Sequence, residues 1–415
     1  MDIKVTRTEL EVLKALAYIL DIEESEKLYH SWRVAVMAKA LAQVKCEDSV
    51  LMLYVAGLLH DMGTFDLPNR MVHYRRHFEV STAPEVRIHP QKSAAIACGL
   101  SGFIPVAKAV FDHHEWINGK GYPRGLKGEQ ISLESQILRI ADKFAFLLDT
   151  EKDIELSDLK PLLGSKIGNE FSKDLYDNLV EIIKQEKLWE SLLDTEKLEK
   201  LTDKIFTQLP VVDDESLEVD KRLISFFGRL LDAKHSYTQG HSLRVSYFSV
   251  IIALAFGLSS EVVERIESAA FLHDIGKIGI PKSILDKRGR LTIEEFEIVK
   301  KHASFSREII ERIPGLGRLS YVLGTDQEHW DGSGYPWNLK KKEIPIEARI
   351  ILVADAFDAM TSTRSYHNAI SVPEALDELK KSAGTDLDPE VVGVAVKVLE
   401  GFENPSISAC YIKSI

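Results

Sequence analysis

A set of histidine and acidic side chains in the first half of the sequence has the residue types and the spacing that metal-ion chemistry requires. Glu26 and His30 stand four residues apart, so on a helix they share one face. Two adjacent pairs follow, one of histidine and aspartate and one of two histidines. Mixed imidazole and carboxylate ligands suit iron, manganese or zinc rather than a purely soft-ligand metal. The candidate ligands of this half are Glu26, His30, His60, Asp61, His89, His113, His114 and Asp142.

An aspartate beside a histidine group can bridge two metal ions, and Asp61 occupies such a position next to His60. Two ions about 3.5–4 Å apart can polarise a phosphoryl oxygen and activate a water molecule for attack on phosphorus. We therefore expect two or three divalent ions, with iron or manganese first and zinc, nickel or magnesium as alternatives. Asp61 is also the expected catalytic residue of this half.

The same pattern of motifs occurs a second time along the chain. The recurring segments are LLHDMG (58–63) and FLHDIG (271–276), NGKGYP (118–123) and DGSGYP (331–336), and RIADKF (139–144) and LVADAF (352–357). All three pairs are separated by 213 positions, which indicates a duplicated domain. We predict domains at 1–208 and 214–415, joined by an acidic, proline-containing linker.

The elements that must position these residues are predicted to be helices throughout. Apolar residues recur at helical spacing in 31–44, and 49–60 is apolar nearly all round, as expected of a central buried helix. Thr292, three residues before Glu295, forms the sequence signature of a helix start. No alternating strand pattern is visible, although a short hairpin near 118–135 remains open. The predicted class is all-α.

Composition and charge exclude several kinds of protein. The net charge of −12 over 415 residues disfavours a long polyanion such as duplex DNA, while a small phosphorylated ligand can still bind beside metal ions. Three cysteines without a CxxC pair indicate neither a disulfide framework nor a zinc finger. The start of the sequence lacks an apolar leader, and the longest apolar run, 250–258, is too short to span a membrane. These features predict a cytoplasmic protein.

The HD pair, the HHE triplet (113–115), the GYP motif and the closing AD together resemble the HD-GYP group of HD-domain phosphohydrolases, twice along the chain. This resemblance implies two tandem helical bundles, a centre of two or three metal ions, and hydrolysis of cyclic di-GMP or a related cyclic dinucleotide such as cyclic GMP-AMP, in bacterial second-messenger signalling. It also implies that the histidines and aspartates named above are metal ligands. Glu26 matches the additional carboxylate of members that hold three ions.

The first copy keeps the ligands but departs from the family elsewhere. The lysine of the family's HDxGK motif is Thr64 here, and the arginine expected after the last aspartate is Glu151, which would repel a phosphate. Tyr122 of the GYP motif remains as an expected substrate contact, through base stacking or to phosphate.

The second copy shows the opposite departure. The family's HHE reads DQE, and Tyr237 replaces the Glu26 equivalent. Lys277 is retained as an expected catalytic cation, and Tyr335 and Arg364 as expected substrate contacts. One ion, a weakly held pair or an empty site would each fit this copy. Its candidate ligands are His241, His273, Asp274, His302, Asp326 and Asp355.

These departures leave several functional interpretations. The favoured one makes the first copy the metal-dependent phosphodiesterase. Alternatively, the second copy is active with an altered centre, or it is a non-catalytic module that binds a cyclic dinucleotide and regulates the first. A further alternative is an HD phosphohydrolase that acts on another nucleotide. The expected partner is a cyclic dinucleotide, and a homodimer is left open.

Overall fold

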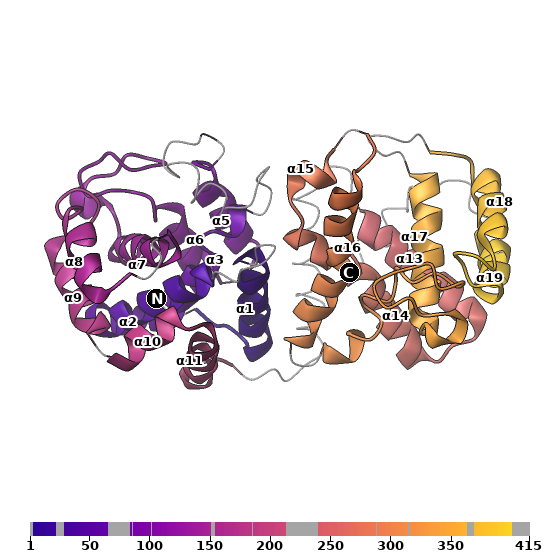
Figure 1. Ribbon diagram of the computed structural model, residues 1–415, viewed down its shortest axis with the longest axis horizontal. Helices are drawn as coiled ribbons and strands as arrows, with labels where there is room; N and C mark the ends of the chain where they lie inside the picture. Colours follow the sequence, from indigo (N-terminus) through magenta and orange to yellow (C-terminus); the bar gives the residue numbers. More distant parts are fainter. Residues whose placement is uncertain are drawn as a thin grey trace. The chain divides into compact units, whose positions relative to one another are not determined.

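The computed structural model describes residues 3–21, 29–64, 84, 86–100, 102–150, 154–184, 186–212, 240–287, 289–313, 316–362 and 369–400. Four residues discussed above, Glu26, Glu151, Tyr237 and Arg364, lie outside the described residues. The chain divides into two compact units, Met1–Glu215 and Ser216–Ile415 (Figure 1).

The described part of the first unit is built from α-helices and short 3-10 turns. Its helices are α1 (Arg7–Asp21), α2 (His30–Lys45), α3 (Val50–Leu59), α5 (His89–Cys98), α6 (Ile104–Phe111), α7 (Leu133–Thr150), α8 (Leu156–Gly164), α9 (Lys173–Ile183), α10 (Glu186–Leu193) and α11 (Thr195–Gln208). Three 3-10 turns, η1 (Glu47–Ser49), η2 (Met62–Thr64) and η3 (Gly128–Gln130), connect them.

The second unit is also helical in its described part. Its helices are α13 (His241–Phe256), α14 (Ser260–Leu272), α15 (Lys282–Leu285), α16 (Ile293–Glu311), α17 (Ile346–Thr361), α18 (Val372–Ser382) and α19 (Pro389–Leu399). The 3-10 turns are η4 (Ile275–Gly279), η5 (Gly317–Leu319) and η6 (Lys341–Glu343).

Each unit has a centre of three helices that contact one another. In the first unit α2 packs against α3 and α7, and in the second α13 packs against α14 and α17 (Figure 1). In the first unit the turn η2, which follows α3, packs on α5. In the second unit the turn η4, which follows α14, packs on α16. Both units therefore place corresponding motif residues at the same point of the bundle.

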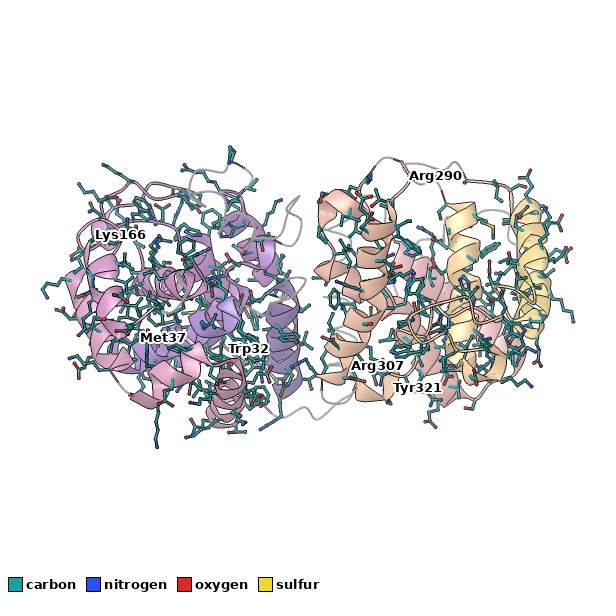
Figure 2. All side chains as sticks on the ribbon, in the orientation of Figure 1. Trp32, Met37, Lys166, Arg290, Arg307 and Tyr321 are labelled. Atoms are coloured by element: carbon teal, nitrogen blue, oxygen red, sulfur yellow. The ribbon has the colours of Figure 1, made fainter. Side chains whose placement is uncertain are left out.

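The helices predicted from apolar spacing are confirmed. The segment 31–44 lies within α2, where Trp32 and Met37 are buried inside the first unit (Figure 2). Segment 49–60 contains α3, which is buried at nearly every position. Thr292 caps α16, accepting a hydrogen bond from the backbone of Glu295 and donating its own backbone N–H to the glutamate side chain.

The all-α class is also confirmed in the part of the chain that the structure describes, which contains no β-strand. The hairpin left open near 118–135 reduces to one isolated antiparallel bridge between Asn118 and Lys127. None of the described helices is long and apolar enough to cross a membrane.

Candidate metal centre

The seven described candidate ligands of the first unit lie at helix ends or face the middle of the bundle. His30 is the first residue of α2 and His89 the first of α5. His60 follows directly after α3, and His113 and His114 come one residue beyond the end of α6, after Asp112. Asp142 lies on the buried face of α7. Helix ends lack part of their backbone hydrogen bonding, so their side chains and carbonyls are available to shape a site.

These side chains converge into two groups. One group consists of Asp61, His89, His113 and His114, and the other of His30, His60 and Asp142; within each, one potential ligand atom per residue lies within 4.8 Å of all the others. Asp61 connects the two groups, because its Oδ1 lies 3.2 Å from His89 Nε2 and its Oδ2 lies 3.4 Å from His60 Nε2. A carboxylate with one oxygen facing each group has the arrangement of a bridging ligand.

The orientation of three of these imidazoles is set by the local backbone. In His60, His89 and His113, Nδ1 lies 2.8, 2.6 and 2.6 Å from the carbonyl oxygen three residues earlier. A carbonyl only accepts, so Nδ1 carries the proton and Nε2 keeps the lone pair that a metal needs. The Nε2 atom of His60 is buried without a hydrogen-bond partner among the described residues, as expected of a ligand. The donor set therefore fits metal ions.

Burial favours the neutral form of His60 and His113. It lowers the pKa of His113 to about 3, with the nearby rings of His89 and His60 acting in the same direction. Burial also lowers the pKa of His60. For Asp142, burial would raise the pKa, but hydrogen bonding to His30 and neighbouring positive groups hold it well below its usual range. Neutral imidazole and ionised carboxylate are the protonation states that bind metals.

A second carboxylate, Asp149, orients His30 from behind. Its Oδ2 lies 2.6 Å from His30 Nδ1, and its Oδ1 accepts a hydrogen bond of 2.8 Å from Arg33. In the second unit Asp358 does the same for His241, at 2.7 Å. The two carboxylates are not equivalent in sequence: Asp149 is seven residues after the ligand Asp142, whereas Asp358 is three residues after Asp355. Sequence reasoning missed Asp149 for this reason.

The glycine of the HDxG motif is required in both units by close packing. A Cβ atom on Gly63 would lie 2.4 Å from the carbonyl oxygen of His89, and one on Gly276 would lie 1.9 Å from that of His302. The Gly63 N–H donates to the Ser93 hydroxyl on α5 at 2.8 Å. The Gly276 N–H donates to the Ser306 hydroxyl on α16 at 2.9 Å. The glycine thus allows the helix that carries the next histidine to approach the site.

The glutamate of the HHE triplet holds the GYP loop rather than facing the ligands. Glu115 accepts backbone hydrogen bonds from Arg124, Gly125 and Leu126, and Glu328 accepts them from Trp337 and Leu339. These bonds fix the conformation of the loop that carries the GYP tyrosine, Tyr122 in the first unit and Tyr335 in the second.

Tyr122 of this loop packs against a histidine and an arginine. Its ring stacks on His114, with centroids 4.8 Å apart and planes inclined by 16°, and the Arg87 guanidinium carbon lies 4.7 Å from the ring centre. The residue is 4% exposed, and its buried hydroxyl has no hydrogen-bond partner among the described residues. A ring that is this buried has no face open to a base, and the hydroxyl is the group available to a ligand.

Arg139 is a buried cation at the centre that sequence reasoning did not identify. Its Nη1 lies 3.0 Å from His114 Nδ1 and 3.1 Å from Asp142 Oδ2, and Nη2 donates to Glu170. Because arginine only donates, His114 Nδ1 accepts, and in the neutral ring the proton is on Nε2. Ligation by His114 therefore requires Arg139 to release this ring. The corresponding residue of the second unit is Leu352.

The second unit gathers a smaller group. His241, His273 and Asp355 each place one ligand atom within 4.8 Å of the others, and Asp274 Oδ2 lies 3.5 Å from His273 Nε2. The Lys277 ammonium donates to the same Asp274 oxygen at 2.6 Å. In the first unit this lysine is replaced by Thr64, whose hydroxyl donates to the Asp61 carbonyl. His302 lies at the edge, with Nε2 3.9 Å from Asp274 Oδ1.

Asp326 does not join this group. The segment equivalent to α6 contains only η5 and turns, and Asp326 accepts the backbone N–H of Gly324 at 2.8 Å and the side-chain amide of Gln327 at 3.1 Å. His329 lies beside Ser333 and Asp386. Burial would lower the pKa of His273, but surrounding carboxylates, including Asp326, raise it. The second site is thus more acidic and less complete.

Comparison with known proteins agrees with these observations. The HD domain family model matches residues 14–153 and 224–391, so the chain belongs to the HD-domain family, with one segment in each unit. It is 32% identical over 296 residues to 3'3'-cGAMP-specific phosphodiesterase 3 of Vibrio cholerae, covering 71% of this chain and 63% of that protein. It is 42% identical over 203 residues to a cyclic di-GMP phosphodiesterase of Thermotoga maritima, covering 48% of this chain and 53% of that protein.

The fold itself is also found in a solved structure. A crystal structure of a cyclic GMP-AMP-specific phosphodiesterase from Vibrio cholerae matches with a TM-score of 0.66 at 23% identity, covering 97% of this chain and 99% of that one. At this identity the likeness concerns the fold.

Proposed function

We propose that this chain is a metal-dependent phosphodiesterase that hydrolyses a cyclic dinucleotide, and that its first unit is the catalytic one. The observation that carries the proposal is the pair of ligand groups joined by the two oxygens of Asp61. The activities of the two relatives, on 3'3'-cGAMP and on cyclic di-GMP, support this substrate class.

The residues of the first unit would serve as metal ligands, as an orienting group and as a substrate contact. Asp61, His89 and His113 would hold one ion, and His30, His60 and Asp142 another, with Glu26 as the candidate ligand of a third. When bound, such ions polarise a phosphoryl oxygen and activate water. Asp149 keeps His30 oriented through its hydrogen bond. The Tyr122 hydroxyl would donate a hydrogen bond to the phosphodiester, since it is buried beside the centre and has no partner among the described residues. Iron or manganese fits this mixed donor set.

The second unit is proposed to bind the same class of ligand without cleaving it. The specific observation is that Lys277 is hydrogen-bonded to Asp274, while Asp326 is held by its own loop. A fixed cation can contact phosphate without an activated water. Lys277, Tyr335 and Arg364 are the residues proposed to contact that ligand.

The test uses the full chain loaded with manganese or iron. Incubation with cyclic di-GMP and, separately, with 3'3'-cGAMP is expected to give linear dinucleotide or mononucleotide products, resolved by liquid chromatography. The matched control is the chain stripped with a chelator and then reloaded. Absence of hydrolysis of both compounds by the reloaded chain would refute the proposed activity.

A further inference from the structure

Arg87 presents an exposed positive charge at the edge of the first centre. It stands two residues before His89, and its guanidinium carbon lies over the ring of Tyr122, which also stacks on His114. Within the part of the chain that the structure describes, no carboxylate forms an ion pair with Arg87. The guanidinium carbon therefore lies near the tyrosine ring, and the described residues leave the charge of Arg87 without a carboxylate partner.

A cation occupies the same place in the second unit, but its charge is engaged. Lys300 stands two residues before His302, and its Nζ lies 5.6 Å from the centre of the Tyr335 ring. Lys300 Nζ is also 2.7 Å from Glu297 Oε1. The pairing of a cation with the GYP tyrosine thus recurs, and only in the first unit do the described residues leave the cation without a carboxylate.

The first unit needs such a charge to bind a cyclic dinucleotide. This ligand carries two phosphodiesters, and only one of them can lie on the metal ions at a time. The motif cation present at Lys277 is Thr64 here. Two other arginines of this region are already paired, Arg139 with Glu170 and Arg124 with Asp112. Arg87 is exposed and has no carboxylate partner among the described residues, so it is the candidate contact for the second phosphate.

We propose that Arg87 binds the phosphodiester of the cyclic dinucleotide that is not being cleaved. The proposal rests on the proposed function. An arginine stacked on an aromatic ring keeps its planar N–H edge free for two parallel hydrogen bonds to phosphate oxygens. Arg87 is then a determinant of substrate specificity, because it favours a ligand with two phosphodiesters over an ester with one.

The test compares two substrates in the metal-loaded full chain. For Arg87→Gln, the KM for cyclic di-GMP should rise about tenfold with little change in kcat, the effect expected from losing one charge-assisted contact at a partly exposed site. Hydrolysis of bis(4-nitrophenyl) phosphate, which has one phosphodiester, should be unchanged. The KM of Arg87→Lys for cyclic di-GMP should lie between those of the wild type and Arg87→Gln, since lysine keeps the charge but lacks the planar N–H edge. Lys108→Gln, at an exposed cation of α6, is the matched control.

The outcomes separate this proposal from the proposed function. An unchanged KM for cyclic di-GMP, or an equal loss of activity on both substrates, would overturn the role of Arg87 while leaving the phosphodiesterase in place. If the wild type cleaves only the simple ester, the proposed function is refuted. The role of Arg87 is then tested by calorimetric binding of cyclic di-GMP to the wild type and to Arg87→Gln. Absent binding, or equal affinity of the two proteins, would overturn the proposal.

Discussion

Asp61 is the side chain on which the two ligand groups of the first unit depend. Replacing it by asparagine keeps the size of the side chain but removes the negative charge that two ions would share. We expect Asp61→Asn to reduce turnover by about a thousandfold or more, since several kcal/mol of metal-dependent stabilisation would be lost. The measurement is the initial rate of cyclic dinucleotide hydrolysis together with metal content.

Asp274→Asn is the matched control for this experiment, because Asp274 holds the corresponding position of the second unit. It should leave most of the turnover intact. The reverse result, with Asp274→Asn inactive and Asp61→Asn active, would assign catalysis to the second unit.

Gly63 tests whether close backbone packing shapes the centre. An added Cβ would meet backbone atoms of His89 and Ser93 at 2.4 and 2.6 Å, so α5 must shift. We expect Gly63→Ala to lower the free energy of unfolding by about 1–3 kcal/mol, as overpacking does, and to weaken metal binding. Gly99→Ala, at the other end of α5, meets only the Ile96 carbonyl oxygen, at 3.1 Å, and should change the free energy of unfolding by about 0.5 kcal/mol or less. Denaturant unfolding measures both, and equal effects would contradict this account.

Helices α7 and α17 supply the same supporting carboxylate from different turns. Residues 145 and 149 of the first unit are Ala and Asp, and the equivalent residues 358 and 362 of the second are Asp and Ser. Ser362 Oγ lies 3.2 Å from Asp358 Oδ1, so the two positions are neighbours on one helix face. A carboxylate at either position can reach the histidine.

This equivalence predicts a loss and a rescue. Asp149→Ser should weaken metal binding about 10- to 100-fold, as loss of a carboxylate behind a histidine ligand does. Adding Ala145→Asp to that variant copies the second unit and should recover most of the affinity. Competition with a chromophoric chelator measures both variants. A double variant that binds metal no better than Asp149→Ser would show that the turn on which the carboxylate lies does matter.

The elements and the ligand positions could be predicted from sequence because each depends on local pattern. Apolar spacing specifies α2 and α3, and the repeated HD and GYP segments indicate which residues come together. Asp149 could not be predicted, since its role depends on which helix faces His30 and not on its distance from the HD motif. Arg139 was missed because a charged residue in an apolar helix gives no sign of its partners. Asp326 has a ligand's chemistry, but the loss of α6 changes its backbone and directs it to Gly324.

Across the whole molecule, the two units are expected to differ in metal content. Among the described residues, the first unit offers two ligand groups and the second unit offers a single group. In the metal-loaded full chain, His60→Gln should lower the number of bound ions by at least one. His273→Gln should lower it by one at most. Elemental analysis against protein concentration measures this, with circular dichroism to confirm folding. Equal losses from both variants, or no loss from His60→Gln, would contradict the division.

The hydrogen bonds from histidine Nδ1 to the carbonyl three residues earlier occur at His60, His89, His113, His273 and His302. Each closes within a single turn of chain, so the rings are ordered when the backbone folds and not when an ion arrives. Chelation should therefore leave the far-ultraviolet circular dichroism spectrum unchanged. The melting temperature should fall by an amount set by free metal concentration over Kd. Unfolding of the bundle on chelation would contradict this. The proposed phosphodiesterase would then persist as folded, inactive protein when metal is scarce, and would regain activity without new synthesis once the ion returns.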